Sequence, residues 1–346
     1  MYKSAIVSAK GRAFGHLSAY QHIHRSRVTG VCDQDASLLD RCRERFDVPA
    51  VYTDLEEMLE KEKPDILHLV TRPSTRVPLL KLASEAGVPA VIVEKPIALD
   101  IQDLLTLREL SQQTNMKVAV NHQLQFHPNR LRLQRAIEEG EIGEVQFIDA
   151  TCGLNLAGQG THLLAMLFSF NGFSPPRSVF GQVSGGDEMT GEGKHEAPEI
   201  ALAAIDFENG VRSMLHAGKG APLLEEQPRH MNKRIRVLGS RGYVHWTMLG
   251  WQLLSEKEGF SEGAHEYGEQ DLLGQAALTE AMVDWLEDDH FIHPTRFDQA
   301  LTECEVNLGI YASALRRAPV HFPLQESSDL LPSMKTVLQS EEALTV

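Results

Sequence analysis

Short apolar segments alternate with longer amphipathic ones over the first 121 residues, and this alternation constrains the fold more than any other feature of the sequence. The apolar segments, which we expect to be strands, are residues 4–7, 28–32, 66–70, 90–93 and 117–120. Helical periodicity is found near residues 15–24, 37–46, 55–61, 77–86 and 101–114. Because a strand that returns to its sheet through a helix runs parallel to the preceding strand, the pattern predicts a doubly wound α/β domain with a parallel sheet.

The pattern changes after residue 122, so we expect one domain over residues 1–122 and a second over 123–346. A basic amphipathic helix at 129–139 is followed by segments in which apolar and polar residues alternate, as in strands with one covered face. These segments are 145–151, 179–183, 201–207, 211–216, 233–238, 243–246 and 251–254. With two helices near 273–288 and 298–315, they predict an α+β domain whose open sheet is mostly antiparallel. A mobile loop is expected at 185–196, and weak packing after residue 325.

Composition excludes several classes of protein. A length of 346 residues with 42% hydrophobic residues is enough for two domains with separate cores. Acidic residues outnumber basic ones by 48 to 33, and the net charge of −15 argues against a nucleic-acid partner. The four cysteines are too widely spaced for a zinc site or a redox pair, so no metal is expected. No segment has the ~20 apolar residues of a membrane span or the core of a signal peptide, which predicts a cytoplasmic protein without a membrane partner.

The turn after the first predicted strand occupies the position at which Rossmann domains carry three phosphate-binding glycines. It reads SAKGRAFG over residues 8–15, so Ser8, Lys10 and Ala13 stand at the glycine positions. A strand still precedes the turn and a helix follows it, as pyrophosphate binding at a helix N-terminus requires. We therefore expect contacts to a dinucleotide from Ser8, Lys10, Gly11, Arg12, Ala13 and Phe14, with phosphate attracted in part by the Lys10 and Arg12 side chains. The alternative is an ordinary turn that binds no phosphate.

Asp33 follows the second predicted strand, about 20 residues beyond the turn, where a carboxylate accepts hydrogen bonds from the adenosine ribose. A carboxylate here repels the 2′-phosphate of NADP, and Gln34 and Asp35, rather than an arginine, come next. Asp33 therefore favours NAD over NADP. The alternative is a solvated acid in a turn.

A charged pair, Glu94 and Lys95, follows the predicted strand 90–93 in a Glu-Lys-Pro sequence. Open α/β sheets bind ligands at the carboxyl ends of their strands. A lysine at that edge can accept the proton of a substrate hydroxyl and stabilise the alkoxide while a hydride is transferred. Lys95 is therefore predicted to be catalytic.

The Glu-Lys-Pro sequence is one of an ordered series of motifs. The others are Thr-Arg-Pro at 71–73, Asn-His-Gln at 121–123, Phe-His-Pro at 126–128, Gly-Glu-Ile-Gly at 140–143, AIDFENG at 204–210 and PVHFPL at 319–324. Together they resemble the glucose–fructose oxidoreductase, inositol dehydrogenase and rhizopine catabolism (Gfo/Idh/MocA) family over nearly the whole chain. The family usually has Thr-Pro where this chain has Thr-Arg-Pro.

This resemblance implies an NAD(P)-dependent dehydrogenase, with NAD as the expected cofactor. Its substrate would be a small polyhydroxylated molecule (a sugar, a glycoside or an inositol), and its second domain would form a homodimer or homotetramer through the open sheet. The cofactor-binding residues carried over from the family are Thr71, Arg72, Pro73, Glu94, Lys95 and Asn121. The substrate-binding residues carried over are His122, Gln123, Asn155, Gln159 and His162.

His162 matches the catalytic histidine of the family's second domain, and we expect it to share proton transfer with Lys95. The family often carries an Asp four residues before this histidine and another three residues after it, whereas this chain has Gly158 and Ala165. Some members have Glu or Gln three residues before the histidine, and Gln159 fits that variant. Without an acid nearby, His162 loses a charge that would orient its ring. The alternative is a histidine that only packs or caps a helix.

Two further interpretations stay open. One is a redox-neutral enzyme in which NAD oxidises a glycoside transiently, elimination breaks the glycosidic bond, and the hydride returns. The other is a non-catalytic regulator that binds a ligand on the same fold, for which the altered turn and the missing acids are the evidence. The retained Glu94, Lys95 and His162 argue against a pure binding protein.

Overall fold

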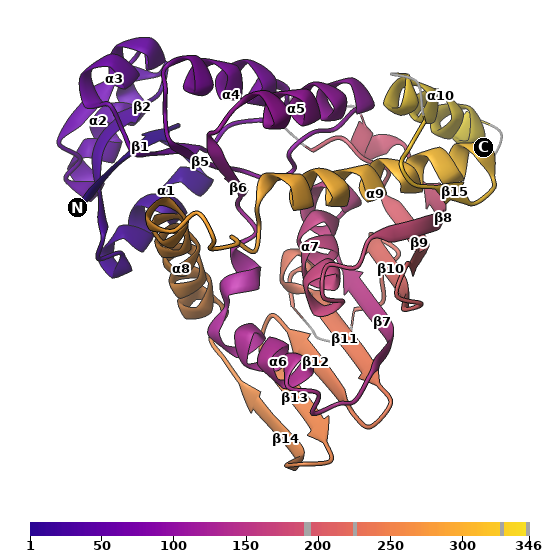
Figure 1. Ribbon diagram of the computed structural model, residues 1–346. Coiled ribbons are helices and arrows are strands. Elements are labelled where there is room, and N and C mark those ends of the chain that lie inside the picture. Colours follow the sequence, from indigo (N-terminus) through magenta and orange to yellow (C-terminus); the bar gives the residue numbers. More distant parts are fainter. Residues whose placement is uncertain (190–194, 224–226, 326–328, 344–346) are drawn as a thin grey trace. The chain divides into compact units, whose positions relative to one another are not determined.

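A computed structural model describes residues 1–189, 195–223, 227–325 and 329–343 of the chain. These residues form two compact units (Figure 1). The first unit contains residues 1–98, 105–127 and 268–301, and the second contains the described residues of 99–104, 128–267 and 302–346. Since the chain passes between the units several times, the domain boundary after residue 122 stays a prediction.

The first unit is built on a parallel sheet with the strand order β3-β2-β1-β4-β5-β6. Its strands are β1 (Tyr2–Val7), β2 (Ser26–Cys32), β3 (Ala50–Tyr52), β4 (Ile66–Leu69), β5 (Ala90–Val93) and β6 (Lys117–Val120). The helices between them are α1 (Arg12–Ala19), α2 (Ala36–Phe46), α3 (Leu55–Glu62), α4 (Arg76–Glu85) and α5 (Ile101–Gln113). The doubly wound α/β prediction is confirmed. Strand β3 was not predicted, because three half-buried residues show no period.

The strand order reverses between β1 and β4, and open α/β sheets bind ligands at the carboxyl ends of the strands where the order reverses. The core on one face of the sheet includes Ile66, Ile92 and Ala119. Helix α8 (Tyr267–Glu287) covers this face with Leu278 and Met282, both fully buried. A helix from the C-terminal part of the chain thus completes the N-terminal sheet.

The second unit contains a nine-stranded sheet with the order β14-β13-β12-β11-β7-β10-β9-β8-β15. Its strands are β7 (Val145–Cys152), β8 (Pro176–Ser184), β9 (Ile200–Phe207), β10 (Arg212–Gly218), β11 (Lys233–Gly239), β12 (Tyr243–Thr247), β13 (Gly250–Ser255), β14 (Gly259–Ala264) and β15 (Val320–His321). Strands β7 and β10 pair in parallel, and the other described pairs are antiparallel. The mostly antiparallel sheet is therefore confirmed, although β14 and β15 were not predicted.

Helices pack on this second sheet. Helix α7 (Thr161–Phe170), which is buried along its whole length, contacts β7 and β11, and α6 (Pro128–Glu138) contacts β12 and β13. Helix α9 (Phe297–Arg316) approaches β8 so closely that a Cβ on Gly181 would lie 2.6 Å from the Ile310 carbonyl oxygen. Strand β9 alternates buried with exposed residues, so the sheet has one covered face and one open face.

The C-terminal segment differs from its prediction. Residues 330–343 form helix α10 (Leu330–Ala343), whose Leu330, Met334 and Leu338 are buried. Apolar residues four apart lie on one face of a helix, which explains why α10 packs well rather than weakly. Its Leu338 faces Gly186, in the segment where a mobile loop was expected. Residues 185–189 of that loop are packed, with Met189 buried, and residues 190–194 lie outside the described residues.

Helix α10 should add measurable stability through its apolar face. We expect Met334→Ala to lower the free energy of unfolding by about 2 kcal/mol or more, because Met334 is 1% exposed and its loss leaves a cavity. Val337→Ala is the matched control, since Val337 is 38% exposed on the same helix. Urea unfolding followed by circular dichroism compares the two variants, and equal stabilities would show that α10 is not docked.

Candidate active site

The carboxyl ends of five adjacent strands bring polar residues to one edge of the first sheet. The residues one or two positions beyond these strand ends include Ser8, Asp33, Thr71, Glu94 and Asn121. The backbone N–H groups of Ser8, Glu94 and Asn121 donate to carbonyls of neighbouring strands at 2.7 to 3.0 Å, so the hydrogen bonding of the sheet extends into the site. These residues are those predicted from the sequence to face a dinucleotide.

The turn that replaces the glycine motif leaves space beside its backbone at Gly11. Ser8 has a φ of 105°, a conformation that glycine adopts without strain and L-residues rarely adopt. Gly11 has a φ of 57° and stands before α1, and a Cβ added to it would meet no atom within 4 Å. Ala13 is fully buried below the turn. The backbone at Gly11 can therefore be approached by a phosphate at the start of α1, as NAD binding requires.

Asp33 is attached to this turn. Its Oδ2 accepts a hydrogen bond from the Ala9 N–H at 2.8 Å, and its Oδ1 accepts one from the Asp35 N–H at 3.1 Å. A carboxylate offers about four lone-pair positions, so Asp33 retains acceptors for ribose hydroxyls. The turn and Asp33 therefore fit a bound NAD.

Three side chains of the turn have different environments. Lys10 is exposed. Phe14 packs against α2, with its ring 5.5 Å from that of Phe46 and 5.0 Å from the Arg45 guanidinium carbon. Arg12, the first residue of α1, donates hydrogen bonds to Asp271 and Gln275 of α8, so its guanidinium already has protein partners. The contacts of these side chains with a cofactor stay predictions.

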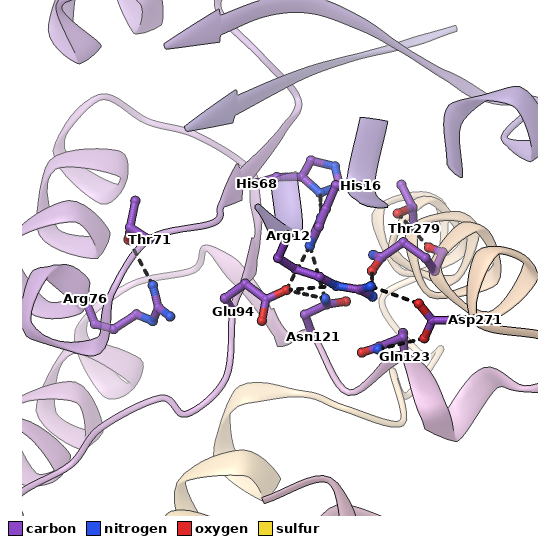
Figure 2. Close-up of polar contacts among 11 residues, drawn as sticks. Arg12, His16, His68, Thr71, Arg76, Glu94, Asn121, Gln123, Asp271 and Thr279 are labelled. Atoms are coloured by element: carbon purple, nitrogen blue, oxygen red, sulfur yellow. Dashed lines mark hydrogen bonds and ion pairs between the residues drawn. The ribbon is translucent and has the colours of Figure 1, made fainter. Parts of the chain in front are cut away.

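The buried Glu94 carboxylate is at the centre of a polar cluster in the first unit (Figure 2). Its Oε1 lies 3.0 Å from His16 Nε2 and 3.6 Å from Arg12 Nε, and it accepts a hydrogen bond from Asn121 Nδ2 at 2.6 Å. Burial raises the pKa of Glu94, but the hydrogen bond from His16 and the charges of Arg12 and Lys95 outweigh it and hold the pKa well below its usual value. Glu94 is therefore ionised at neutral pH.

A second acid, Asp271 of α8, lies on the other side of Arg12 (Figure 2). Its Oδ2 is 2.9 Å from Arg12 Nη1, and its Oδ1 accepts a hydrogen bond from Gln123 Nε2 at 2.9 Å and lies 3.6 Å from His127 Nε2. Burial raises the pKa of Asp271, but the bond from His127 and the charge of Arg12 depress it overall. Gln123, predicted to bind substrate, is thus held by Asp271.

Thr71 and its neighbours form the turn after β4. The Thr71 hydroxyl accepts a hydrogen bond from Arg76 Nη1 at 3.0 Å. Arg76 is completely buried, and burial lowers the pKa of its guanidinium to about 10. Arg72 is exposed, whereas Pro73 is buried at the start of a short 3₁₀ helix. The hydrogen bond from the buried Arg76 thus anchors Thr71 in the turn that is predicted to bind the cofactor.

Lys95 and His122 follow the ends of β5 and β6. Burial and then the positive charge of Lys95 lower the pKa of His122 to about 3. His122 is therefore neutral at physiological pH and lies within the electrostatic reach of Lys95. A neutral imidazole can donate one hydrogen bond and accept another, as the binding of a substrate hydroxyl requires.

The remaining predicted site residues belong to the second unit. Asn155 precedes a π-helical turn (Leu156–Gly160) and accepts a hydrogen bond from the Gly158 N–H at 2.7 Å. Gln159 Nε2 donates to the His230 carbonyl at 2.8 Å, and His162 is buried in the first turn of α7. A Cβ on Gly158 would lie 2.9 Å from Asn155 Oδ1, so an aspartate there would be crowded by another oxygen. An acid at residue 158 would therefore require the Asn155 side chain to shift.

Sequence reasoning missed several residues of the polar cluster, among them His16, His68, Asp271 and Gln275. His68 had a detectable signal, because a histidine inside the apolar strand Ile66–Leu69 must find hydrogen-bond partners. Asp271 and Gln275 carry no such signal, since the contact of α8 with α1 spans more than 250 residues. Among the described residues, no group of three or more His, Cys, Asp or Glu is arranged to hold a metal, and no helix is long and apolar enough to cross a membrane.

Comparison with known proteins agrees with this geometry. Residues 4–122 match the model of the oxidoreductase family with an NAD-binding Rossmann fold. D-apiose dehydrogenase of Paraburkholderia graminis is 27% identical over 142 residues, which are 41% of this chain and 38% of that protein. Inositol 2-dehydrogenase of Rhizobium meliloti is 30% identical over 87 residues, 25% of this chain and 26% of that protein. These alignments thus span well under half of the relatives' length.

The fold of the whole chain also has counterparts among solved structures. An oxidoreductase from Agrobacterium radiobacter, in complex with NAD+, L-tartaric acid and magnesium, superposes with a TM-score of 0.80 at 15% identity. The superposition covers 92% of this chain and 98% of that one. At this identity, the likeness establishes a shared fold.

The Ser8 backbone makes a direct prediction about stability. We expect Ser8→Gly to raise the free energy of unfolding by about 1 kcal/mol. A strained positive φ costs roughly 1–3 kcal/mol, which glycine relieves, but the greater flexibility of glycine in the unfolded chain offsets part of this stabilisation. Ser8→Ala keeps the strained φ and serves as the control. Urea unfolding of both variants tests the assignment, and a Ser8→Gly protein no more stable than Ser8→Ala would refute it.

Proposed function

This chain belongs, through residues 4–122, to the Gfo/Idh/MocA oxidoreductase family, and from that premise we propose that it transfers a hydride between NAD(H) and a carbinol carbon of a sugar, glycoside or inositol. The observation that carries the proposal is the placement of Lys95 directly after the buried, ionised Glu94 at the carboxyl end of β5. The Asn121 amide donates to the same carboxylate from the end of β6.

The cofactor would be held at the turn over residues 8–14 and at Asp33. The open backbone at Gly11 would receive phosphate, and the free lone pairs of Asp33 would accept hydrogen bonds from the adenosine ribose. Bound NAD+ would supply the hydride acceptor for alcohol oxidation. Asp33 also supports NAD over NADP, because a 2′-phosphate would be placed beside its negative charge.

The chemistry that this chain would contribute is proton transfer at Lys95. In its neutral form the Lys95 amine would accept the hydroxyl proton of the substrate as the carbinol carbon gives up its hydride, so that alcohol and NAD+ would yield carbonyl, NADH and a proton held on Lys95. The ammonium formed in this way would stabilise negative charge that develops on the substrate oxygen. The neutral His122 ring would bind a hydroxyl group. A share in proton transfer for His162 is carried over from the family resemblance.

A polyhydroxylated substrate is supported by the names of the relatives, D-apiose dehydrogenase and inositol 2-dehydrogenase. The second unit offers Gln159, whose Oε1 is buried and has no partner among the described residues. That oxygen would accept a hydrogen bond from a substrate hydroxyl.

We also propose that the open face of the second sheet forms a homodimer or homotetramer. Phe180 and Met214 both pair with Ala204 across β8, β9 and β10, and Phe180 and Met214 are 41% and 40% exposed. Leu202, two residues before Ala204 on the same face, is 38% exposed. An exposed apolar patch of adjacent strands is typical of a subunit interface.

The proposed reaction is tested with the full chain in two steps. Mass spectrometry of the purified protein identifies any nucleotide that copurifies, and absorbance at 340 nm then follows NAD+ reduction with a panel of sugars, glycosides and inositols. A product at 340 nm supports the dehydrogenase. Cleavage of a glycoside with retained NAD and no net absorbance change would instead identify the redox-neutral enzyme, and no turnover with any panel member contradicts the proposal.

Asp33 should set the preference for NAD. We expect Asp33→Asn to narrow the ratio of NADP+ to NAD+ dissociation constants by about tenfold, or ~1.4 kcal/mol, because it removes the charge while keeping an oxygen for the Ala9 N–H. Asp33→Ala also loses that hydrogen bond and should weaken both nucleotides. Calorimetric titration measures the constants, and tighter NADP+ than NAD+ binding to the unsubstituted protein would contradict the assignment.

Lys95 should be needed for turnover and not for folding. We expect Lys95→Ala to reduce kcat by at least ~100-fold, the lower range for a positioned acid–base group, while the NADH dissociation constant changes little. Lys117→Ala is the control, because Lys117 is a lysine of the same sheet whose Nζ bonds α8 and Asp289. Normal turnover by Lys95→Ala on a substrate from the panel would disprove the mechanism.

A further inference from the structure

Two histidines are buried side by side in the core of the first unit, which is an unusual use of ionisable side chains. His16 of α1 is 1% exposed and His68 of β4 is 0% exposed. Their rings are perpendicular, and their Nδ1 atoms are 3.0 Å apart (Figure 2). The other ring nitrogens are also bonded, since His16 Nε2 lies 3.0 Å from Glu94 Oε1 and His68 Nε2 lies 2.9 Å from the Tyr20 hydroxyl.

The partners of these nitrogens determine where the protons are. Glu94 is ionised and can only accept, so its 3.0 Å contact places a proton on His16 Nε2. The Asn121 amide nitrogen lies 3.1 Å from the same Nε2, which as a donor offers that amide no acceptor. The Asn121 amide is 2.6 Å from Glu94 Oε1 and donates there, because its oxygen in that place would face the carboxylate. Burial lowers the pKa of both histidines, so each ring is neutral. His16 Nδ1 is then an acceptor, His68 donates from Nδ1, and the Tyr20 hydroxyl donates to His68 Nε2.

The result is a chain of three hydrogen bonds that all point toward Glu94, which directly precedes Lys95. We propose that His68, acting through His16, is a positioning residue that fixes the Glu94 carboxylate beside Lys95 for the dehydrogenase reaction. Removing the donor on His68 leaves His16 free to change its tautomer. A His16 ring without a proton on Nε2 would repel Glu94 and displace it.

The direction of the chain argues for positioning rather than proton conduction. Every donor faces Glu94, so a proton placed on Glu94 meets no free acceptor along the chain. Conduction of a proton along the chain toward Glu94 would leave a tyrosinate at Tyr20. Burial raises the pKa of Tyr20 and so disfavours that ion. The charged groups that act on His16 are Glu94, Arg12 and Asp271, and these also favour a fixed arrangement over a mobile proton.

The first test reads the protons directly and needs no substrate. In protein labelled with ¹⁵N at histidine, two-bond ¹H–¹⁵N correlation spectra distinguish protonated from bare ring nitrogens, and His16→Gln and His68→Asn spectra assign the signals. We expect His16 protonated on Nε2 alone and His68 protonated on Nδ1 alone between pH 7 and 8. The opposite tautomers, or a charged ring in that range, would overturn the inference even if the protein proves to be an active dehydrogenase.

The second test measures the consequence for the site and rests on the proposed function for its kcat. His68→Leu removes the donor to His16, and we expect kcat to fall at least about tenfold while the NADH dissociation constant stays within about threefold. His68→Asn retains an N–H near the Nδ1 position and should recover most of this loss. Tyr20→Phe removes the outermost bond of the chain, together with the hydroxyl's contacts to Ser4 and Ser26, and should cost less than His68→Leu.

The outcomes separate the alternatives. If Tyr20→Phe lowers kcat as much as His68→Leu, the chain conducts protons and the positioning role is wrong. If His68→Leu and His68→Asn lose kcat equally, the donor on His68 is not what holds Glu94. If His68→Leu fails to fold, the spectra of the unsubstituted protein and of Tyr20→Phe still decide the direction of the chain.

Discussion

The first unit depends on an ionised carboxylate that is kept away from water. An unpaired buried charge costs several kcal/mol, and Glu94 avoids that cost only because its oxygen receives donors from α1 and from the end of β6. The need for these donors restricts where α1 and the end of β6 can lie relative to β5. It also requires that a cation be nearby, and Arg12 is shared between Glu94 and Asp271. The polar cluster thus orders the sheet edge at which chemistry is proposed.

Arg12 shows how the altered glycine turn and the distant helix α8 are connected. In place of a guanidinium free to meet phosphate, the turn supplies one that bonds Asp271 and Gln275. Phosphate approach is left to the backbone at Gly11, where space is open. Ser8 and Ala13 occupy two of the three glycine positions. Both are compatible with phosphate approach at the Gly11 backbone, because Ser8 adopts a strained positive φ and Ala13 is buried.

Features with a local cause were predictable from the sequence. Strands β5 and β6 match their predicted bounds residue for residue, because apolar segments of that length between turns have few other structures. The same holds for Glu94 and Lys95, whose position follows from the end of β5. The contact of α8 with the first sheet was not predictable, since its amphipathic pattern does not tell which sheet it covers. Helix α10 was missed although its buried residues are spaced four apart, which is a helical pattern.

The placement of α8 has a consequence for synthesis of the chain. The face of the first sheet that carries Ile66, Ile92 and Ala119 is complete once residue 120 has left the ribosome, but Leu278 and Met282 that cover it are made later. At ~5–20 residues per second, that interval is on the order of ten seconds. During this time the nascent N-terminal sheet has an uncovered apolar face while the second unit is emerging.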